Sequence, residues 1–339
     1  MAASRRSPKS IPLPMQAVYL PMQQVAAVLA AGELGVFAAL RRGPRAAATL
    51  ARGLGTDLHA LTRLCDQLVA TGWLVRARNG YANASATQQW FTSSGAVDYT
   101  AGLRWTQHAW RLQPELAAAV RRGGPRRSLW RRMQREPGMG ERFADYMLAF
   151  ARHSAPEFAR SIRMPRGASR LLDIGGSHGL HAIAACAAHP RLEAVVLDHA
   201  VSLRGTMANV RAAGLQGRVR TRVGDCRHAD LGTGTFDVVH YFSVAHNQTA
   251  ADNARMLRKC ARALRPGGLL VIHDYVRGQL PEPYGSAFDL TLLVEVGTHT
   301  HTLADFRGWV ADAGLSAFRH RRLAPAEMGS LMTARKPRF

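Results

Sequence analysis

Acidic residues and a glycine-rich turn follow short apolar runs in the C-terminal half of the chain. The run SRLLDIGG leads into the turn 173–179, and the next two runs end in Asp198 and Asp225. Glycines let a ligand approach the backbone closely, and an acid after the second strand can accept both hydroxyls of a ribose. The turn has neither the GxGxxG signature nor a P-loop lysine to hold phosphate. An aspartate after a strand is often only a helix cap, but the order and spacing together favour a site for adenosine without a phosphate.

A histidine, His246, ends another apolar run, VVHYFSVAH. A histidine in this position can act as a base, a metal ligand, a cofactor contact or a structural residue. Its chemistry therefore depends on the elements that surround it.

Apolar runs alternate with helical stretches from residue 169 onwards. The strand candidates are SRLLDIGG, LEAVVLDHA, RVRTRVGDC, FDVVHYFSV and GGLLVIHDY. This alternation predicts an α/β domain with a parallel sheet and helices on both faces. Right-handed crossovers make the sheet doubly wound, and its ligand crevice then lies beyond the carboxyl ends of the strands.

The N-terminal half has helical rather than alternating spacing. Helices are predicted over 22–40, 46–54 and 57–71, with Asp57 as the N-cap and Gly72 as the C-terminal stop of the last one. WLVRARNGYANA follows, and Asn79-Gly80 can supply the positive φ angles of a hairpin turn. Three helices and a hairpin predict a winged helix. Its helix 57–71 offers only Arg63 as a strong base reader, so dimerisation is favoured over DNA binding.

Residues 99–160 also have helical spacing. We expect most of their large apolar anchors to lie in the core: Trp105, Trp110, Phe143, Met147 and Phe150.

Charge and composition limit the class of protein. The net charge is +22, and the densest basic stretch, residues 121–135, suggests an anionic partner. A solvated helix face and loop is the favoured interpretation, because aromatic stacking residues are nearly absent there. No apolar run reaches membrane-spanning length. The cysteines form no CxxC pair, which predicts a reduced, cytoplasmic location without a disulfide framework: Cys65, Cys186, Cys226 and Cys260.

Residues from about 20 to 335 resemble the S-adenosylmethionine-dependent O-methyltransferases that modify small, often aromatic, natural products. The matching pieces are LLDIGGSHG, the acid of VVLDHA, VGDC, FDVVHYFSVAH, ALRPGG and TLADFRGWVADAGL. The resemblance implies S-adenosylmethionine as cofactor, a small-molecule acceptor and a homodimer formed through the N-terminal domain. It implies a winged-helix dimerisation domain (17–98), a helical linker that contributes to the substrate pocket (99–165) and a class I methyltransferase domain with a Rossmann-like doubly wound sheet (166–339). Residues 1–16 are basic and Pro-rich, which predicts a loose arm.

The same resemblance implies roles for individual residues. His246 stands where the family places the general base for the acceptor hydroxyl, and Asp274 stands where a carboxylate orients that base. The implied cofactor-binding residues are Asp173, Gly175, Gly176, Gly179, Asp198, Asp225, Cys226 and Ser243. The candidates for the acceptor pocket are Phe143, Met147, Asn247, Phe288 and Leu292, with Trp105 and segment 297–301.

The sequence departs from the family pattern in three places. Asn247-Gln248 replaces the usual Asp-Trp after the histidine. A second carboxylate, expected near an Arg-Thr pair, is replaced within GTHTHT, where Thr300 and His301 stand. Ser177-His178 replaces the commoner glycine and threonine in the glycine-rich turn.

Other functions remain open at this point. His299 and His301 could join His246 in holding a metal ion for C-methylation of a 2-oxo acid, although a loop leading to a helix capped by Thr302 is the favoured interpretation. A non-catalytic, ligand-sensing DNA-binding protein would use the same two domains. RNA methylation would use the basic stretch, but no RNA-binding module accompanies it.

Overall fold

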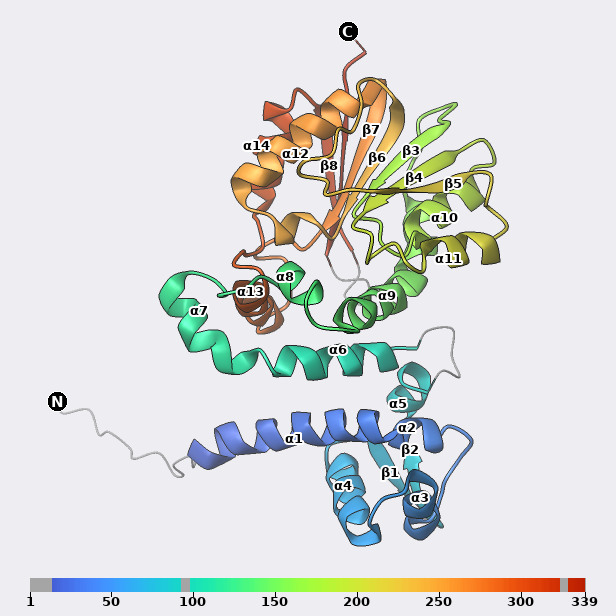
Figure 1. Cartoon of the computed structure of the whole chain (residues 1–339), viewed down its shortest axis with the longest axis vertical. Coiled ribbons are helices and arrows are strands. Elements are labelled where there is room, and N and C mark those ends of the chain that lie inside the picture. The colour runs from blue at the N-terminus through green and yellow to red at the C-terminus, as the bar shows by residue number, and fades with distance from the viewer. Residues whose placement is uncertain (1–13, 93–97, 324–328, 339) are drawn as a thin grey trace, which may run out of the picture. The chain divides into compact units, whose positions relative to one another are not determined.

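The computed structural model describes residues 14–92, 98–323 and 329–338, and the chain forms two compact units, residues 1–108 and 109–339 (Figure 1).

The N-terminal unit is mainly helical and carries a small antiparallel hairpin. Its elements are α1 (Pro14–Leu34), α2 (Val36–Ala39), α3 (Ala47–Leu54), α4 (Leu58–Ala70), β1 (Leu74–Ala77), β2 (Gly80–Asn83), α5 (Ser85–Trp90) and the start of α6 (Thr100–Trp110). Phe37, Leu50, Cys65, Leu68 and Tyr81 form part of its buried core. The helices and hairpin expected from the sequence are therefore present.

The helix predicted over 22–40 is not continuous. Gly35 separates α1 from α2 with a left-handed φ of 79°, a conformation that ends helices and that glycine adopts without strain. At the other end α1 already begins at Pro14, so the last residues of the predicted loose arm are helical. The rest of that arm lies outside the described residues.

Only one of the two residues predicted to have a positive φ in the hairpin turn has one. Gly80 has a positive φ of 132°, whereas Asn79 does not have a positive φ. A Cβ on Gly80 would lie 2.0 Å from the carbonyl oxygen of Arg45. Arg45 and Tyr81 exchange backbone hydrogen bonds of 2.9 Å, so glycine is needed for this close approach of a third segment.

Helix α4 begins as predicted, and one of its acidic residues contacts the hairpin. The Asp57 side chain accepts from the Ala60 amide at 2.8 Å, which confirms the N-cap. The carboxylate of Asp66 accepts from Arg76 and from the hydroxyl of Tyr81. This acid therefore stabilises the hairpin against the helix.

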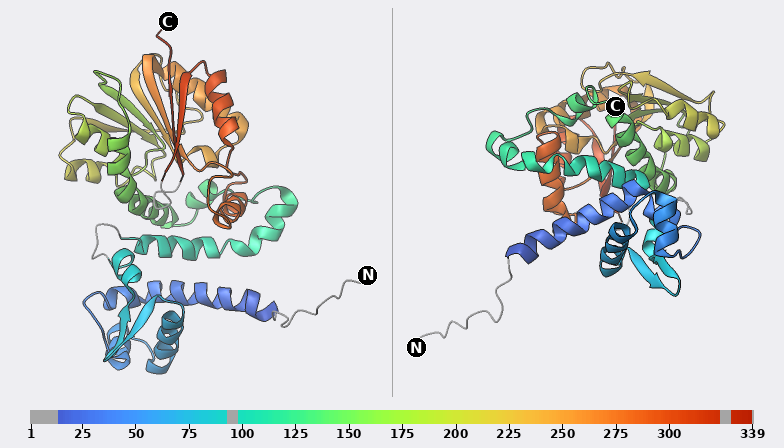
Figure 2. Two further views of the ribbon diagram at one scale, coloured as in Figure 1. Left: turned by 180° about the vertical axis from the view of Figure 1, so that it is seen from behind. Right: turned by 60° about the horizontal axis from the view of Figure 1, so that its bottom comes forward.

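The C-terminal unit contains a seven-stranded sheet in the order β5-β4-β3-β6-β7-β9-β8 (Figures 1 and 2). Its strands are β3 (Arg170–Ile174), β4 (Glu193–Asp198), β5 (Val219–Val223), β6 (Phe236–Phe242), β7 (Leu264–Asp274), β8 (Ser316–Arg322) and β9 (Ser330–Arg335). Neighbours from β5 to β7 are parallel, and β9 is antiparallel to both β7 and β8. The parallel strands are those predicted from the sequence.

Strands β8 and β9 were missed in the sequence. Strand β8 (SAFRHRR) is an edge strand with mostly exposed residues, so it has no apolar alternation to reveal it. Strand β9 is short and mostly buried, and it pairs with β7 over Asp274↔Ser330 to Leu269↔Arg335. The five predicted strands are parallel to one another, and these two antiparallel strands extend the sheet at one edge.

Helices cover both faces of the sheet (Figure 2). Helices α12 (Ala250–Ala263) and α14 (Leu303–Asp312) pack on one face through residues such as Leu257 and Phe306. Helices α9 (Met139–Ser161), α10 (Leu180–Ala188) and α11 (Thr206–Ala212) pack on the other through residues such as Phe158, Ile183 and Val210. The doubly wound α/β architecture is confirmed.

The helical region predicted over 99–160 is interrupted. Besides α6 and α9 it contains η1 (Gln113–Glu115), α7 (Leu116–Arg122) and α8 (Leu129–Met133). Of the expected core anchors Trp105 is buried, but Trp110 is 40% exposed, and Phe143, Met147 and Phe150 are half-buried. The expectation that most of these anchors lie in the core was therefore wrong.

Candidate active site

The predicted polar residues gather at the carboxyl ends of the parallel strands. Asp173 lies in β3, Asp198 ends β4 and Asp274 ends β7. Asp225 follows β5, and His246 lies in the short helix η2 (Ala245–Asn247) that follows β6. This edge is where an open α/β sheet binds its ligands.

The turn after β3 approaches its neighbours closely. A Cβ on Gly176 would lie 2.5 Å from Oδ2 of Asp173, and one on Gly175 would lie 2.5 Å from Cγ2 of Val244. Gly179 has a positive φ of 75°, and Ser177 adopts a positive φ of 42°, which is uncommon for a residue with a side chain. Such strained backbone is characteristic of functional sites.

Asp198 is held in place by the backbone. Its Oδ2 accepts from the Ser177 amide at 3.0 Å, and its Oδ1 accepts from the His199 amide at 2.7 Å. Burial raises its pKa, although these two amides oppose the shift. Each oxygen retains a lone pair for a further hydrogen bond.

Asp173 and Asp225 have opposite electrostatic environments. Burial and the nearby Asp198 raise the pKa of Asp173 to about 7. Asp225 lies against Arg227, whose Nη2 approaches to 2.6 Å. Burial raises its pKa, but the hydrogen bonds from Arg227 outweigh burial and lower it to about 2. The sequence analysis missed Arg227, although it lies only two residues from the acid.

Two further predicted cofactor residues, Ser243 and Cys226, lie just after the carboxyl ends of β6 and β5. Ser243 has a positive φ of 56°, and its amide donates to the carbonyl of His273 at 2.8 Å. The carbonyl of Cys226 accepts from Lys259 at 2.6 Å. Burial raises the pKa of the Cys226 thiol to about 12, so the thiol is neutral.

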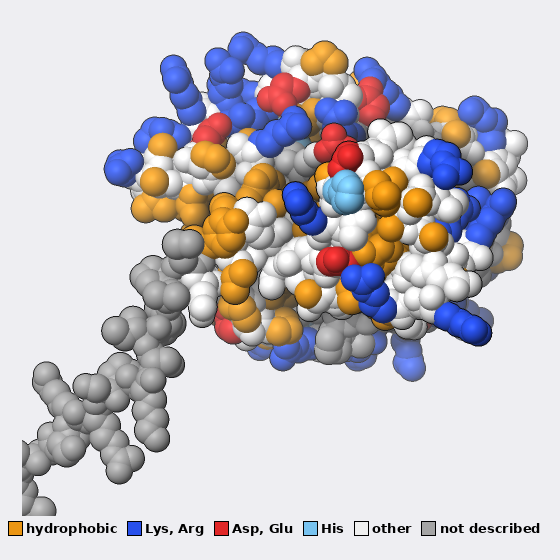
Figure 3. Space-filling view, turned by 90° about the horizontal axis from the view of Figure 1, so that it is seen from below, with side chains coloured by type: hydrophobic (Ala, Val, Ile, Leu, Met, Phe, Trp, Pro, Cys, Tyr) orange, Lys and Arg blue, Asp and Glu red, His pale blue; other side chains and the backbone are white. Residues whose placement is uncertain are grey.

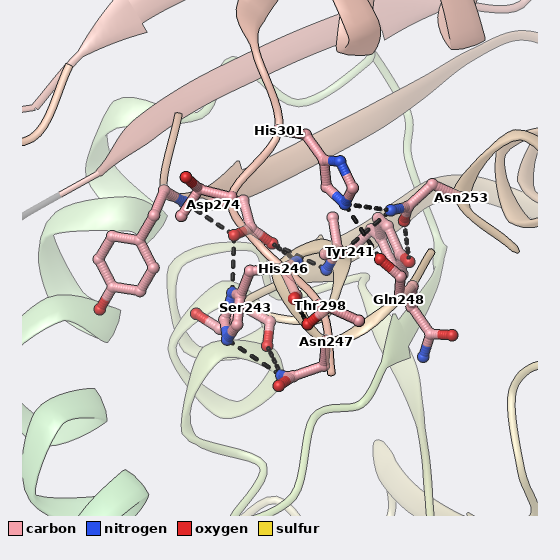
Figure 4. A network of polar contacts seen from close by, with 12 residues as sticks. Tyr241, Ser243, His246, Asn247, Gln248, Asn253, Asp274, Thr298 and His301 are labelled. Atoms are coloured by element: carbon pink, nitrogen blue, oxygen red, sulfur yellow. Dashed lines mark hydrogen bonds and ion pairs between the residues drawn. The ribbon is translucent and has the colours of Figure 1, made fainter. Parts of the chain in front are cut away.

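His246 and Asp274 form a buried pair (Figure 4). Nδ1 of His246 lies 2.7 Å from Oδ1 of Asp274. The carboxylate also accepts from the amides of Ala245 and Tyr275, both at 2.8 Å. Burial raises the pKa of Asp274, but His246 and the Tyr275 amide outweigh burial and hold it below its ordinary value of 3.8.

This pairing fixes the tautomer of His246. An ionised carboxylate only accepts, so the proton of the neutral imidazole lies on Nδ1 and Nε2 has a lone pair. Nδ2 of Asn247 lies 3.0 Å from that Nε2 and can donate to it. Nε2, the nitrogen that can accept a proton, is thus in contact with the side chain of Asn247, which replaces the aspartate of the family pattern.

Aromatic side chains surround the imidazole. The rings of Tyr275 and Phe288 lie with their centroids 5.5 Å and 5.6 Å from that of His246. Phe288 and the buried Leu292 belong to α13 (Tyr284–Glu295). Phe143 of α9 packs edge-on against Trp130 of α8, with the centroids 6.0 Å apart.

The three histidines of the metal hypothesis (His246, His299 and His301) do not form one group of ligands in the described structure. Nε2 of His301 lies 3.0 Å from the carbonyl oxygen of Gln248 and 3.1 Å from Nδ2 of Asn253, and its ring packs against Trp309 (Figure 4). Nδ1 of His299 lies 3.0 Å from the carbonyl oxygen of Thr300. In the part of the chain that the structure describes, no three histidine, cysteine or acidic side chains form a group that could hold a metal ion. Thr302 caps α14 with a complete capping box, as the competing interpretation expected.

Thr300 and Glu295 complete the surroundings of the pair. Asp289 accepts from the amide and the hydroxyl of Thr300, at 2.7 and 2.8 Å. Glu295, the last residue of α13, is partly buried, with Oε1 inaccessible to solvent. Burial raises its pKa to about 7, while His246 opposes the shift. The sequence analysis missed Glu295, because a lone acid in an apolar helix has no motif around it.

Comparison with known families identifies the chain. An O-methyltransferase domain model matches residues 115–316, and an O-methyltransferase dimerisation domain model matches residues 23–93. The chain belongs to the O-methyltransferase family. The protein is an S-adenosylmethionine-dependent methyltransferase with an N-terminal dimerisation domain.

Individual relatives agree with this family. The chain is 30% identical to a 3-hydroxy-5-methyl-1-naphthoate 3-O-methyltransferase of Streptomyces sahachiroi over 87% of each chain. A solved protein of Nostoc punctiforme superposes with a TM-score of 0.86 at 26% identity, covering 96% of this chain and 100% of that one. Human N-acetylserotonin methyltransferase, solved with S-adenosylmethionine, shares the fold with a TM-score of 0.83 at 18% identity, covering 98% of this chain and 100% of that one.

None of the described helices of the methyltransferase is long and apolar enough to cross a membrane.

The buried pair predicts a specific loss of stability. Asp274→Asn removes the charge that the amides and the imidazole stabilise, so we expect the free energy of unfolding at pH 7 to fall by about 2–4 kcal/mol. Glu157→Gln is the control, because Glu157 forms a surface pair with the 70% exposed Arg160, and it should change stability by less than about 0.5 kcal/mol. Urea denaturation followed by circular dichroism measures both.

The same measurement has a pH signature. The folded-state pKa of Asp274 lies below 3.8, so its contribution is present above that pH and is lost as the pH falls below it. The difference between Asp274→Asn and the wild type should therefore shrink in acid. Equal stability of the two proteins at pH 7 would contradict the pairing.

Proposed function

We propose that the methyltransferase transfers a methyl group to a hydroxyl of a small aromatic natural product, with His246 as the general base. The observation that carries this proposal is the 2.7 Å contact between Nδ1 of His246 and Asp274, which leaves the lone pair of the imidazole on Nε2. An aromatic acceptor is supported by the Streptomyces relative, whose name specifies a hydroxynaphthoate.

The residues at the carboxyl ends of the strands fit S-adenosylmethionine. Asp198 offers a lone pair on each oxygen to the two ribose hydroxyls, and the closely packed Gly176 leaves backbone space that a side chain would fill. In this proposal Asp173, Gly175, Gly179, Ser243 and Cys226 complete the site. Asp225 is the acceptor for the adenine amine, with Arg227 holding the carboxylate in its ionised form. When bound, the cofactor supplies an electrophilic sulfonium methyl group.

The contribution of the protein to the chemistry is proton removal and positioning. An acceptor hydroxyl displaces the amide of Asn247 from Nε2 of His246 and donates to that nitrogen. Asp274 stabilises the imidazolium that forms when the proton moves. Holding the hydroxyl oxygen in line with the methyl group supplies much of the rate, because it removes the entropic cost of the encounter.

The proposed acceptor pocket has an aromatic wall beside the base. Phe288 and Tyr275 contact His246, and Phe288 stacks on Tyr284 with an interplanar angle of 5°. Leu292 continues this wall along α13, while Phe143 and Met147 of α9 remain candidates. Flat apolar rings of this kind suit a planar acceptor.

Cofactor binding is tested at Asp198. Asp198→Ala should remove charge-assisted hydrogen bonds to the ribose and weaken S-adenosylmethionine binding by about 1.5–3 kcal/mol in calorimetry. Asp230→Ala, at a side chain that is 80% exposed, is the control and should bind as the wild type does. Unchanged affinity of the Asp198 variant would remove this residue from the site.

Proton removal is tested at His246. His246→Ala should lower kcat by about 10²–10⁴ and leave cofactor affinity nearly unchanged. Asp274→Asn should lower kcat less, because the base remains and only its orientation suffers. Assays with labelled S-adenosylmethionine and a panel of phenols measure both, and His59→Ala at an exposed site of α4 is the control. A fully active His246→Ala enzyme would refute the base.

Dimerisation is the remaining part of the proposal. We infer a homodimer because the N-terminal domain belongs to a dimerisation family and α1 exposes apolar side chains, including Val18 at 69% and Leu20 at 47%. Figure 3 shows hydrophobic side chains beside the point where the N-terminal segment joins the described chain.

Sedimentation velocity at tens of micromolar should give a dimer. The double variant Val18→Asp, Leu20→Asp should dissociate it, because two charges would be buried without partners. Val120→Asp, at a 59% exposed valine of α7, should not. A monomeric wild type would contradict this inference.

A further inference from the structure

Glu295 lies on the face of α13 that contacts His246. Phe288, Leu292 and Glu295 are spaced four and three residues apart, so they share one face of the helix. Phe288 packs edge-on against the imidazole. Another side of the helix, with Val294, packs with Leu112 instead. The side chain of Glu295 is therefore on the face of α13 that packs against His246.

The chain that follows α13 holds this arrangement against the base. Gly297 ends the helix with a positive φ of 79°, and its amide donates to the carbonyl of Leu292 at 2.9 Å. The hydroxyl of Thr298 then donates to the backbone carbonyl of His246 at 2.6 Å (Figure 4). The end of α13 is thus fixed to the residue that carries the base. The electrostatic effect of His246 on Glu295 agrees with this proximity.

Among the described residues, Oε1 of Glu295 differs from the neighbouring carboxylate oxygens in having no donor. Its Oε1 is buried and has no hydrogen-bond partner in residues 14–92, 98–323 and 329–338. Asp274 accepts several hydrogen bonds, and Asp289 on the same helix accepts two from Thr300. A buried acid without a donor is costly. Such groups are concentrated in functional sites, where a ligand supplies the missing partner.

We propose that Glu295 determines acceptor specificity: it accepts a hydrogen bond from a hydroxyl or amine of the acceptor that is adjacent to the hydroxyl deprotonated by His246. This inference rests on the proposed function. The acceptor class is a planar ring with two neighbouring donor groups, of the catechol or aminophenol type. One donor pairs with Nε2 of His246 and the other with Glu295.

The segment 297–301 explains why this role falls to Glu295. Thr300 stands where the family resemblance predicts a carboxylate, and its amide and hydroxyl both donate to Asp289. Thr300 carries no carboxylate, and its hydroxyl proton is directed at Asp289, so it supplies no charged acceptor beside the base. Glu295, five residues earlier at the end of α13, supplies a carboxyl group near the same base.

The test uses matched acceptors that differ in one neighbouring group. The series is 2-naphthol, 3-methoxy-2-naphthol, 2,3-dihydroxynaphthalene and 3-amino-2-naphthol, assayed for kcat/KM with S-adenosylmethionine. Calorimetry with S-adenosylhomocysteine present measures their binding. The wild type should prefer the dihydroxy and amino compounds over 2-naphthol by about 10-fold or more, as expected for a hydrogen bond to a carboxylate. The methoxy compound, which lacks a second donor, should gain nothing.

Variants assign this preference to Glu295. Glu295→Leu should bring the ratio between 2,3-dihydroxynaphthalene and 2-naphthol to about one, because no acceptor atom remains. Glu295→Gln should give an intermediate ratio, since its amide oxygen still accepts. Asp312→Asn, at an exposed acid of α14, should keep the wild-type ratio. S-adenosylhomocysteine should bind to both Glu295 variants as it does to the wild type, which separates specificity from folding.

The outcomes are distinguishable. Equal ratios in the wild type and Glu295→Leu would overturn the role of Glu295 and leave the base intact. Failure of all four compounds to bind, with S-adenosylhomocysteine still bound, would contradict the proposed aromatic acceptor, and this inference with it. Glu295→Gln should also raise the melting temperature at pH 8, because it removes a buried charge. A lower melting temperature would show that the protein itself satisfies the carboxylate, and would overturn the inference.

Discussion

The buried carboxylate of Asp274 connects the elements on which the candidate site depends. It ends β7 and accepts hydrogen bonds from the Ala245 amide and from Nδ1 of His246, both in η2, which follows β6. Such a charge is tolerated in the interior only when its oxygens are satisfied. The adjacency of β6 and β7 in the parallel sheet meets that requirement, because both strands end at the same edge. The sheet order therefore determines which nitrogen of the imidazole is available for chemistry.

Carboxylates at this edge differ in what surrounds them, and the difference separates their proposed tasks. Asp274 is satisfied by amides and an imidazole, and Asp225 is held ionised by Arg227. Asp198 is oriented by amides but retains acceptor capacity, whereas Glu295 is partly buried with one oxygen unpartnered within the described residues. The first two are stable without a ligand. We propose that the last two gain a hydrogen-bond partner when a ligand binds, Asp198 from the cofactor and Glu295 from the acceptor.

The parallel strands and the polar residues at their carboxyl ends were predicted from the sequence, because both follow from local patterns. Apolar runs that end in an acid or a histidine mark a parallel strand and its carboxyl end together, as Asp198 and His246 do. Features set by distant contacts were not predictable. Nothing near Gly80 shows that Arg45 packs on it, and the exposed edge strand β8 has no apolar alternation.

The same limit explains the histidines of the GTHTHT segment. His301 fits a metal ligand by type and spacing, but its imidazole lies between Gln248, Asn253 and the ring of Trp309. Those partners come from α12, α14 and the turn before α12, so only the folded chain reveals the competition for His301. Glu295 shows the converse, since its proposed role rests on Oε1 having no hydrogen-bond partner in the described part of the chain.

The tautomer of His246 is the most direct test of its proposed role as the base. Nitrogen-15 chemical shifts of labelled imidazoles, assigned by comparison with His246→Asn, distinguish a protonated Nδ1 from a protonated Nε2 at pH 8. We expect Nδ1 to carry the proton in the wild type and Asp274→Asn to allow a mixture of tautomers. A wild-type enzyme with the proton on Nε2 would refute the base, because that nitrogen could not then accept the proton of the acceptor.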